Sequence, residues 1–321
     1  MGLPKTFSFT CSVCVFLAVF QTSSGSWEQP EYSEAHYEWM RSTTCNNMDE
    51  VLVAINFEDD SVTPYGDTGD TTINYSKNCY VVFPNETTRS EYRLESGTEE
   101  EMNAANKTAL GYGNIFMTHE TPCGACSDLE NLATYLSVPD LTSPVRSCGI
   151  GRNEQNHIRC LEDIGFRGHC TWIWYYNTVN TKLSESDDGC FGICVLYMFS
   201  PNIEETGTNN YCDPSRCENT INGQPACSAD QWENGPYRLN PCLQCDECRS
   251  GPVFKKVAGR TRRDSGIPSA IPRPPDDIVE LTHYYGMFNS QGGKRTFVAN
   301  EEAGTTKNYG QNLHFRTSLR N

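Results

Sequence analysis

The cysteines place the strongest constraint on how this chain folds. Seventeen cysteines occur in 321 residues, and 13 of them lie between Thr121 and Cys248. Cysteine at this density is typical of secreted domains held by disulfide bonds, because cytosolic thiols are kept reduced. Most of these sulfurs are therefore expected to be structural crosslinks. That expectation depends on the compartment, for which the N-terminus carries the evidence.

The first 25 residues have the three parts of a secretory signal peptide. Lys5 supplies a basic start, an apolar run extends from Phe7 to Phe20, and small polar residues follow as far as Gly25. The apolar run has about 14 residues, which is short of the ~20 needed for a membrane-spanning helix. No later segment is long and apolar enough to act as a membrane anchor. We expect residues 1–25 to be removed and the mature protein to be secreted.

Charge and glycosylation signals narrow the choice of partners. The formal net charge of the full sequence is −16. Nucleic acids and anionic membranes bind basic surfaces, so neither is expected as a partner. N-glycosylation sequons begin at Asn74, Asn85 and Asn106, which indicates an exposed segment that carries glycans. The expected partner is an extracellular protein or a glycan.

The number of cysteines in the mature chain is odd. Fifteen remain when Cys11 and Cys14 leave with the signal peptide, since 17 minus two is 15. At least one sulfur must then be free, bound to another group, or shared between two chains in a disulfide-linked dimer. Within the first half of the chain, we expect Cys45 to pair with Cys79.

The pattern of predicted elements divides the mature chain into two halves. Residues 26–118 are expected to form a glycosylated β-rich segment. Residues 119–286 are expected to form a cysteine-rich helical segment that packs with the first as one domain, and 287–321 a flexible tail. The predicted fold class is α+β, with a small N-terminal antiparallel β region followed by a disulfide-rich, mainly helical region.

Individual elements follow from apolar periodicity and from capping residues. Ser33 and Asn153 are predicted helix caps, Gly165 a helix end, and Ser127 with Glu130 has the spacing of a capping box. The predicted strands are 51–57, 79–83, 90–94 and 113–118, and the predicted helices are 33–40, 127–136, 153–164, 190–199 and 276–285.

A CxxC motif stands at the start of the helical half. Cys123-Gly-Ala-Cys126 lies directly before a predicted helix, whose N-terminus would stabilise a thiolate. The unit from Gly113 to Leu136 resembles the active-site segment of the thioredoxin superfamily. That resemblance implies Cys123 as the nucleophile and Cys126 as the resolving thiol. The alternative interpretation is that each cysteine tethers this helix to another part of a disulfide framework.

Two further motifs have both a chemical and a structural interpretation. Cys242, Cys245 and Cys248 have the spacing of zinc or iron–sulfur ligands, but no fourth ligand follows nearby and extracellular thiols oxidise, so no metal site is assigned. The run Arg260-Thr-Arg262-Arg263 matches the R-x-R-R pattern cut by proprotein convertases. Alternatively, these arginines bind carboxylates and fix the chain between two helices.

The remaining candidates favour structural roles. The acidic loop 58–70 fits no EF-hand spacing and is expected to be solvated. No HExxH, GxSxG or phosphate-binding glycine loop is present, so no cofactor is expected. The aromatic group that could stack on sugars is expected to be core, because each ring buries a large apolar area. Its members are Trp172, Trp174, Tyr175 and Tyr176.

The chain contains no complete catalytic set. We therefore expect a secreted, disulfide-stabilised glycoprotein that acts as an extracellular binding or interaction module with an unknown ligand. Two alternatives stay open. One is a thiol–disulfide oxidoreductase of the secretory pathway or extracellular space that uses Cys123 and Cys126. The other is a secreted hydrolase whose acid–base pair cannot be recognised from sequence.

Overall fold

The computed structural model describes most of the chain between Glu31 and Tyr285. The described residues are 31–57, 73–84, 88–105, 114–187, 189–197, 199–208, 233–285, 287–289 and 296–298. The expected signal peptide, the acidic loop 58–70 and the sequon residues Asn85 and Asn106 lie outside these ranges. Among the described residues, no helix has the length and apolar character needed to cross a bilayer.

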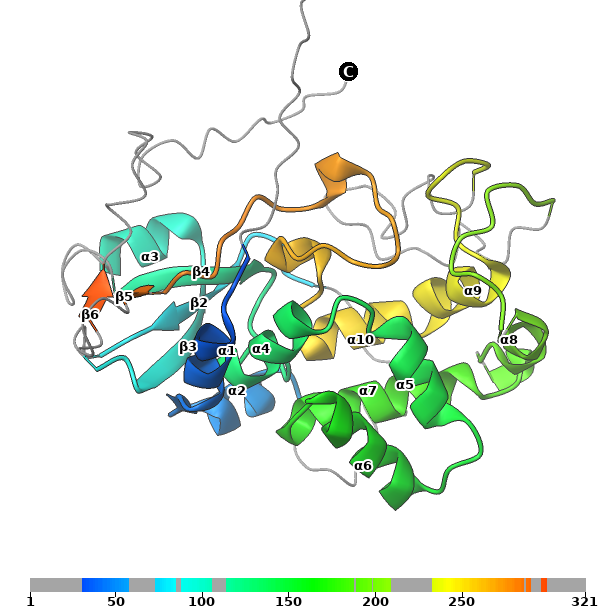
Figure 1. Cartoon of the computed structure of the whole chain (residues 1–321), viewed down its shortest axis with the longest axis horizontal. Helices are drawn as coiled ribbons and strands as arrows, with labels where there is room; N and C mark the ends of the chain where they lie inside the picture. Colours follow the sequence, from blue (N-terminus) through cyan, green and yellow to red (C-terminus); the bar gives the residue numbers. More distant parts are fainter. Residues whose placement is uncertain are drawn as a thin grey trace, which may run out of the picture.

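A four-stranded mixed sheet forms the N-terminal part of the fold, with its strands in the order β1-β3-β2-β4 (Figure 1). β2 pairs antiparallel with β3 and β4, whereas β1 pairs parallel with β3. Tyr92 and Leu94 of β3 are buried and alternate with more exposed neighbours, as in a strand with one covered face. The elements of this part are α1 (Glu34–Arg41), β1 (Thr44–Cys45), α2 (Met48–Ala54), β2 (Asn78–Val82), β3 (Glu91–Gly97), α3 (Glu99–Ala105) and β4 (Ile115–Glu120).

The predicted strands 79–83, 90–94 and 113–118 correspond to β2, β3 and β4, but the strand predicted over 51–57 is wrong. Its residues belong largely to α2. The side chain of Asn47 donates to the carbonyl of Leu94 at 2.9 Å and accepts from its N–H at 2.8 Å. This amide occupies the edge of β3 beyond the end of β1, so the chain turns away into a helix instead of continuing beside the strand.

Helices make up the rest of the described fold (Figure 1). The predicted caps of α1 and α6 are confirmed, because Ser33 accepts from the N–H of His36 and Asn153 from that of Asn156. Gly165, with a φ of 123°, ends α6. The elements are α4 (Leu129–Ser137), α5 (Thr142–Gly149), α6 (Glu154–Ile164), α7 (Gly168–Thr181), η2 (Glu185–Asp187), α8 (Phe191–Tyr197), α9 (Pro241–Arg249), α10 (Gly251–Ala258), η4 (Arg263–Ser265), η5 (Pro275–Asp277), β5 (Met287–Asn289) and β6 (Thr296–Val298).

Two helix predictions need correction. The cap of α4 is Asp128 rather than Ser127, because Asp128 accepts from the N–H of Asn131. The helix predicted over 276–285 is wrong beyond the single turn η5. The chain there bonds to distant partners instead, since the N–H of His283 donates to the hydroxyl of Tyr32 at 2.7 Å. These tertiary contacts replace the local hydrogen bonds of a helix.

Five disulfide bonds lie between described cysteines, and Cys248 is also disulfide-bonded. The predicted pair of Cys45 with Cys79 is wrong. β3 lies between β1 and β2, so these two cysteines are not neighbours, and Cys45 is a free thiol in the described structure. The bonds are Cys79–Cys123, Cys126–Cys170, Cys148–Cys160, Cys190–Cys245 and Cys194–Cys242.

The CxxC loop joins the sheet to the helices. The N–H of Ala125 donates to the carbonyl of Val257 at the end of α10, at 2.8 Å. A Cβ atom on Gly124 would lie 2.5 Å from the backbone nitrogen of Gly259, so only glycine allows this approach. One cluster of buried apolar side chains includes residues from both sides of the loop. The predicted α+β, disulfide-rich fold is confirmed.

Candidate functional site

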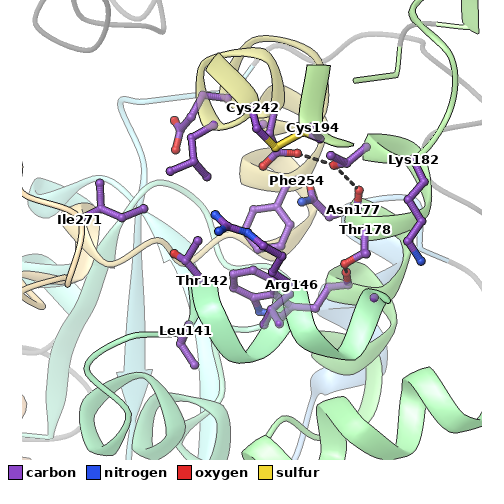
Figure 2. A pocket seen from close by; sticks show the side chains of 18 of the residues that line it. Leu141, Thr142, Arg146, Asn177, Thr178, Lys182, Cys194, Cys242, Phe254 and Ile271 are labelled. Atoms are coloured by element: carbon purple, nitrogen blue, oxygen red, sulfur yellow. Dashed lines mark hydrogen bonds between the residues drawn. A yellow bond between two sulfur atoms is a disulfide. The ribbon is translucent and has the colours of Figure 1, made fainter. Parts of the chain in front are cut away.

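A cavity of about 530 Å³ lies among α5, α7, α8, α9 and α10, and the segment 261–273 covers part of it (Figure 2). Val145 of α5, Trp174 of α7 and Phe254 of α10 line it with apolar surface. In the view of Figure 2, Ile271 and Lys182 lie at opposite sides of the hollow. The cavity therefore has an aromatic and aliphatic centre with charged groups around it.

Disulfide bonds hold the helices that form the walls. Cys148–Cys160 ties α5 to α6, and Cys126–Cys170 ties the CxxC loop to the start of α7. Two further bonds join α8 to α9, and one of them, Cys194–Cys242, borders the cavity in Figure 2. The crosslinks therefore fix α8 to α9 and anchor α5 and α7 to elements next to the cavity.

Aromatic contacts make the apolar wall rigid. The ring of Trp174 stacks on Phe166 with centroids 5.1 Å apart and meets the edge of Phe254 at 4.7 Å. The indole N–H of Trp174 donates to the hydroxyl of Tyr135 at 3.2 Å, so the polar atom of this ring is satisfied. Trp174 packs against the core, as the core interpretation of the aromatic group expects, and also faces the cavity.

Asp246 of α9 lies in the cavity wall as an acid whose pKa is raised. Burial raises its pKa to about 6, although hydrogen bonds from Thr181, Asn177 and Ser250 oppose that rise. These three partners come from α7 and from the junction of α9 with α10. The carboxylate of Asp246 therefore joins α9 to α7 through hydrogen bonds.

Glu247, the next residue, has the opposite electrostatic environment. Arg273 donates to its carboxylate at 3.0 Å, Lys255 lies at 3.7 Å and Arg263 at 3.9 Å. Burial by itself raises the pKa of Glu247, but the three cations outweigh that effect and lower it to about 2. Glu247 is ionised throughout the physiological pH range.

The charge of the cavity is opposite to that of the whole protein. Among its described lining residues, seven are cationic and two are acidic, while the full sequence carries −16. A low-dielectric cleft lined by one sign of charge concentrates ligands of the other sign. The cations are Arg146, Arg152, Lys182, Lys255, Arg262, Arg263 and Arg273, and the acids are Asp246 and Glu247.

Exposed apolar side chains gather on α8, beside the cavity. Phe191 is 54% exposed and Val195 47%, and both also line the cavity. Leu196 on the same helix is 77% exposed and Phe199 just after it 91%. No side chain of α8 is buried. The cavity is therefore continuous with an apolar surface, a combination typical of binding sites.

The two cysteines of the CxxC motif do not pair with each other. Cys123 is bonded to Cys79 in β2, and Cys126 to Cys170 in α7, over 44 residues in each case. Both are buried. This pairing is the one that the structural interpretation of the motif expects, and it leaves no dithiol at the start of α4.

Cys242 and Cys245 of the second cysteine motif are also in disulfides, with Cys194 and Cys190. In the described part of the chain, no group of three or more histidine, cysteine or acidic side chains could hold a metal ion. The described sequon residue, Asn74, is exposed.

The basic run at 260–263 is built into the fold. Arg260 is fully buried, and Arg262 donates to the carbonyls of Val138 and Pro268. Arg263 lies 3.8 Å from Asp277 as well as close to Glu247. These contacts favour the interpretation that the arginines fix the chain between elements, although most of their partners are carbonyl oxygens rather than carboxylates.

A serine–histidine pair that sequence reasoning missed lies beneath the CxxC loop. The hydroxyl of Ser127 lies 2.8 Å from Nε2 of His119, and Nδ1 of that ring lies 2.7 Å from the carbonyl of Glu120. Both side chains are fully buried, and Ser127 also accepts from the N–H of Gly124. Neither residue lines the cavity described above. The pair has the geometry of a hydrogen-bond bridge inside the core.

The cavity residues Asp246 and Glu247 were also missed by sequence reasoning. They stand within the cysteine motif Cys242–Cys248, in which only the cysteines have a recognisable spacing. The sequence does carry a signal for this site, because basic residues are concentrated from Lys255 to Arg273 in an otherwise acidic chain. Of these residues, only the run at 260–263 belongs to a recognised motif.

A protein-family model matches the segment that forms most of the cavity wall. Residues 154–233 and 224–281 match the model of a family of unknown function (DUF8771). This region supplies α7, α8, α9 and α10, and hence most of the cavity wall. No curated protein and no solved structure matches the chain.

Proposed function

We propose that this protein is an extracellular binding protein that holds a small ligand with an apolar body in the cavity among α5, α7, α9 and α10. The observation that carries the proposal is the cavity itself: about 530 Å³, lined by Trp174, Phe254 and Val145, and walled by disulfide-linked helices. Ligand sites of small molecules are concave, mostly apolar and preformed, with a few polar groups that orient the ligand.

The extracellular location rests on the disulfides and on the N-terminal sequence. Five disulfide bonds among described residues are typical of extracellular proteins. Removal of residues 1–25 as a signal peptide and glycosylation at Asn74, Asn85 and Asn106 are parts of the proposal. So is contact with an extracellular protein or glycan, for which the exposed apolar side chains of α8 offer a surface.

The state of the two acids favours binding over catalysis. Asp246 accepts hydrogen bonds from three side chains, and Glu247 is surrounded by three cations. A general acid or base needs a free oxygen within reach of the substrate. Hydrogen bonds from the protein's own groups hold Asp246, and the cations lower the pKa of Glu247 to about 2, which makes it a weak base. The cavity therefore supports a hydrolase less well than a binding protein. Cys123 and Cys126 pair with distant cysteines and not with each other. This pairing favours a binding protein over an oxidoreductase.

Binding can be tested with N-phenyl-1-naphthylamine, a neutral apolar dye that fluoresces when it leaves water. We expect saturable binding at one site by the secreted, disulfide-intact protein. Ile150 lines the cavity and is 46% exposed, so Ile150→Trp places a larger side chain in the lining without disturbing the core. The expected affinity loss for this variant is at least about tenfold, or about 1.4 kcal/mol.

Val53→Trp is the matched control. Val53 is 70% exposed on α2 and does not line the cavity, so the same large ring placed there should leave dye binding unchanged. Equal binding by the two variants and the wild-type protein would show that the dye does not use the cavity, and it would overturn the proposed function.

A further inference from the structure

The three cations around Glu247 have far fewer hydrogen bonds than donors. Within the described structure, the only hydrogen bond from the side chains of Lys255, Arg263 and Arg273 is the one from Arg273 to Glu247 at 3.0 Å. Lys255 and Arg263 approach Glu247 only at ion-pair distances of 3.7 and 3.9 Å. An ammonium group has three donors and a guanidinium five, so most of this donor capacity is unused.

These unused donors are withdrawn from water. The side chain of Arg273 is only 7% exposed, that of Lys255 15% and that of Arg263 19%. Nη1 of Arg273 is buried and has no hydrogen-bond partner, and neither do Oε2 of Glu247 and Oδ2 of Asp277, which lie 3.7–3.9 Å from the cations. The donors of the three cations outnumber these two acceptor atoms, and a buried charged donor without a partner destabilises the fold. All three residues line the cavity, so an acceptor placed there would meet this requirement.

The net charge of the cluster indicates the charge of the ligand group that it can bind. Lys255, Arg263 and Arg273 carry +3, while Glu247 and Asp277, the carboxylates within ion-pair distance, carry −2, which leaves +1. Asp264, whose field acts on Lys255, adds a negative charge from outside the cavity lining. Over the described lining itself, seven cations face two acids.

We propose that this cluster is the head-group subsite of the cavity, and that it binds a carboxylate carried on an apolar body. A carboxylate supplies one negative charge and several acceptor lone pairs, which matches both the residual charge and the unpaired donors. The apolar body lies along Trp174, Phe254 and Ile271, which line the rest of the same cavity. The inference rests on the proposed function and adds the chemical class of the ligand.

The test compares two probes that differ only in the head group, dodecanoate and dodecanol, by calorimetric titration of the disulfide-intact protein. We expect dodecanoate to bind at least about tenfold more tightly, because its carboxylate forms charge-assisted hydrogen bonds that the hydroxyl of dodecanol cannot form. In Lys255→Gln this preference should disappear while dodecanol binding stays unchanged. Lys256→Gln, which removes the same charge from a neighbouring residue outside the cavity, should retain the preference.

The outcomes separate the two proposals. If both probes bind equally and Lys255→Gln changes neither, the head-group subsite is wrong while the proposed function stands. If neither probe binds, the proposed function fails and the subsite fails with it. Preferential binding of dodecylammonium would also overturn the subsite. Arg263→Gln is a second variant with the same expected loss, should Lys255→Gln fail to give the wild-type near-ultraviolet circular dichroism.

Discussion

Arg260 is a fully buried charge that the protein's own oxygens satisfy. Its guanidinium makes five hydrogen bonds, to the carbonyls of Cys126, Thr118 and Ser127 and to the hydroxyls of Thr118 and Ser265, at 2.6–3.2 Å. These acceptors belong to β4, the CxxC loop and the turn after α10. The side chain thus bonds together three segments that are distant in sequence, as arginine does with its fixed fork of donors.

A substitution at Arg260 tests this role. Arg260→Lys keeps the charge but supplies three donors in place of five, so several buried acceptors lose their partners. We expect a loss of about 3–5 kcal/mol in the free energy of unfolding, measured by urea denaturation with the disulfides intact. Arg159→Lys, at an exposed position on α6, is the control and should be neutral. A loss below about 1 kcal/mol at Arg260 would contradict this role.

α8 shows how an element can be placed by covalent bonds rather than by burial. It contributes no buried side chain, yet two disulfides fix it to α9. Cys190 and Cys194 are four residues apart, as are neighbours on one helical face, and they meet Cys245 and Cys242 in antiparallel order. The remaining faces of α8 are free to expose Phe191 and Leu196 beside the cavity.

The dependence of α8 on its crosslinks can be measured by hydrogen exchange. In the double variant Cys194→Ser with Cys242→Ser, amides of residues 191–197 should exchange at least about tenfold faster, because one crosslink and few buried contacts then hold the helix. The free energy of unfolding should fall by about 2 kcal/mol, the low end for a disulfide, because Cys190–Cys245 still closes the surrounding loop.

The disulfide between α5 and α6 is the control. Cys148→Ser with Cys160→Ser should leave exchange in residues 191–197 unchanged. Unchanged exchange in the first double variant would show that packing, not covalent bonding, holds α8 in place.

At the scale of the whole molecule, buried histidines make stability depend on pH. Burial, and then the charge of Arg260, lowers the pKa of His283 to about 3 and that of His119 well below its usual value. Both rings stay neutral in the folded protein but bind a proton in the unfolded chain below about pH 6.5. The unfolded state therefore gains protons first, and stability is lost as the pH falls below 6.5.

Asp246 has the opposite effect on stability. Its pKa of about 6 in the folded protein lies above its value in the unfolded chain, so the folded state binds the proton first as the pH falls and is stabilised. Burial also lowers the pKa of His36 and of His157, so the histidines outweigh Asp246. We expect the free energy of unfolding to fall by at least about 2 kcal/mol between pH 7.5 and pH 5.5. Urea midpoints at the two pH values measure this. Asp246→Asn should make the fall steeper, and a higher midpoint at pH 5.5 would contradict the prediction.

The amino-acid sequence by itself determined the features that depend on residues close together in the chain. Ser33, Asn153 and Gly165 mark helix ends through hydrogen bonds that span four residues or fewer, so their roles could be read directly. The alternation in β3 and the cysteine density likewise predicted an α+β fold held by disulfides. These inferences need no knowledge of how distant segments meet.

Tertiary structure alone decided which distant groups meet. The order of the strands separates Cys45 from Cys79, and the amide of Asn47 ends β1 and starts α2 by bonding to another strand. The cavity brings Glu247 of α9 to Arg273 across 26 residues. Periodicity and capping carry no information about such contacts. The contacts depend on the path of the whole chain and on which side chains pack into each buried space.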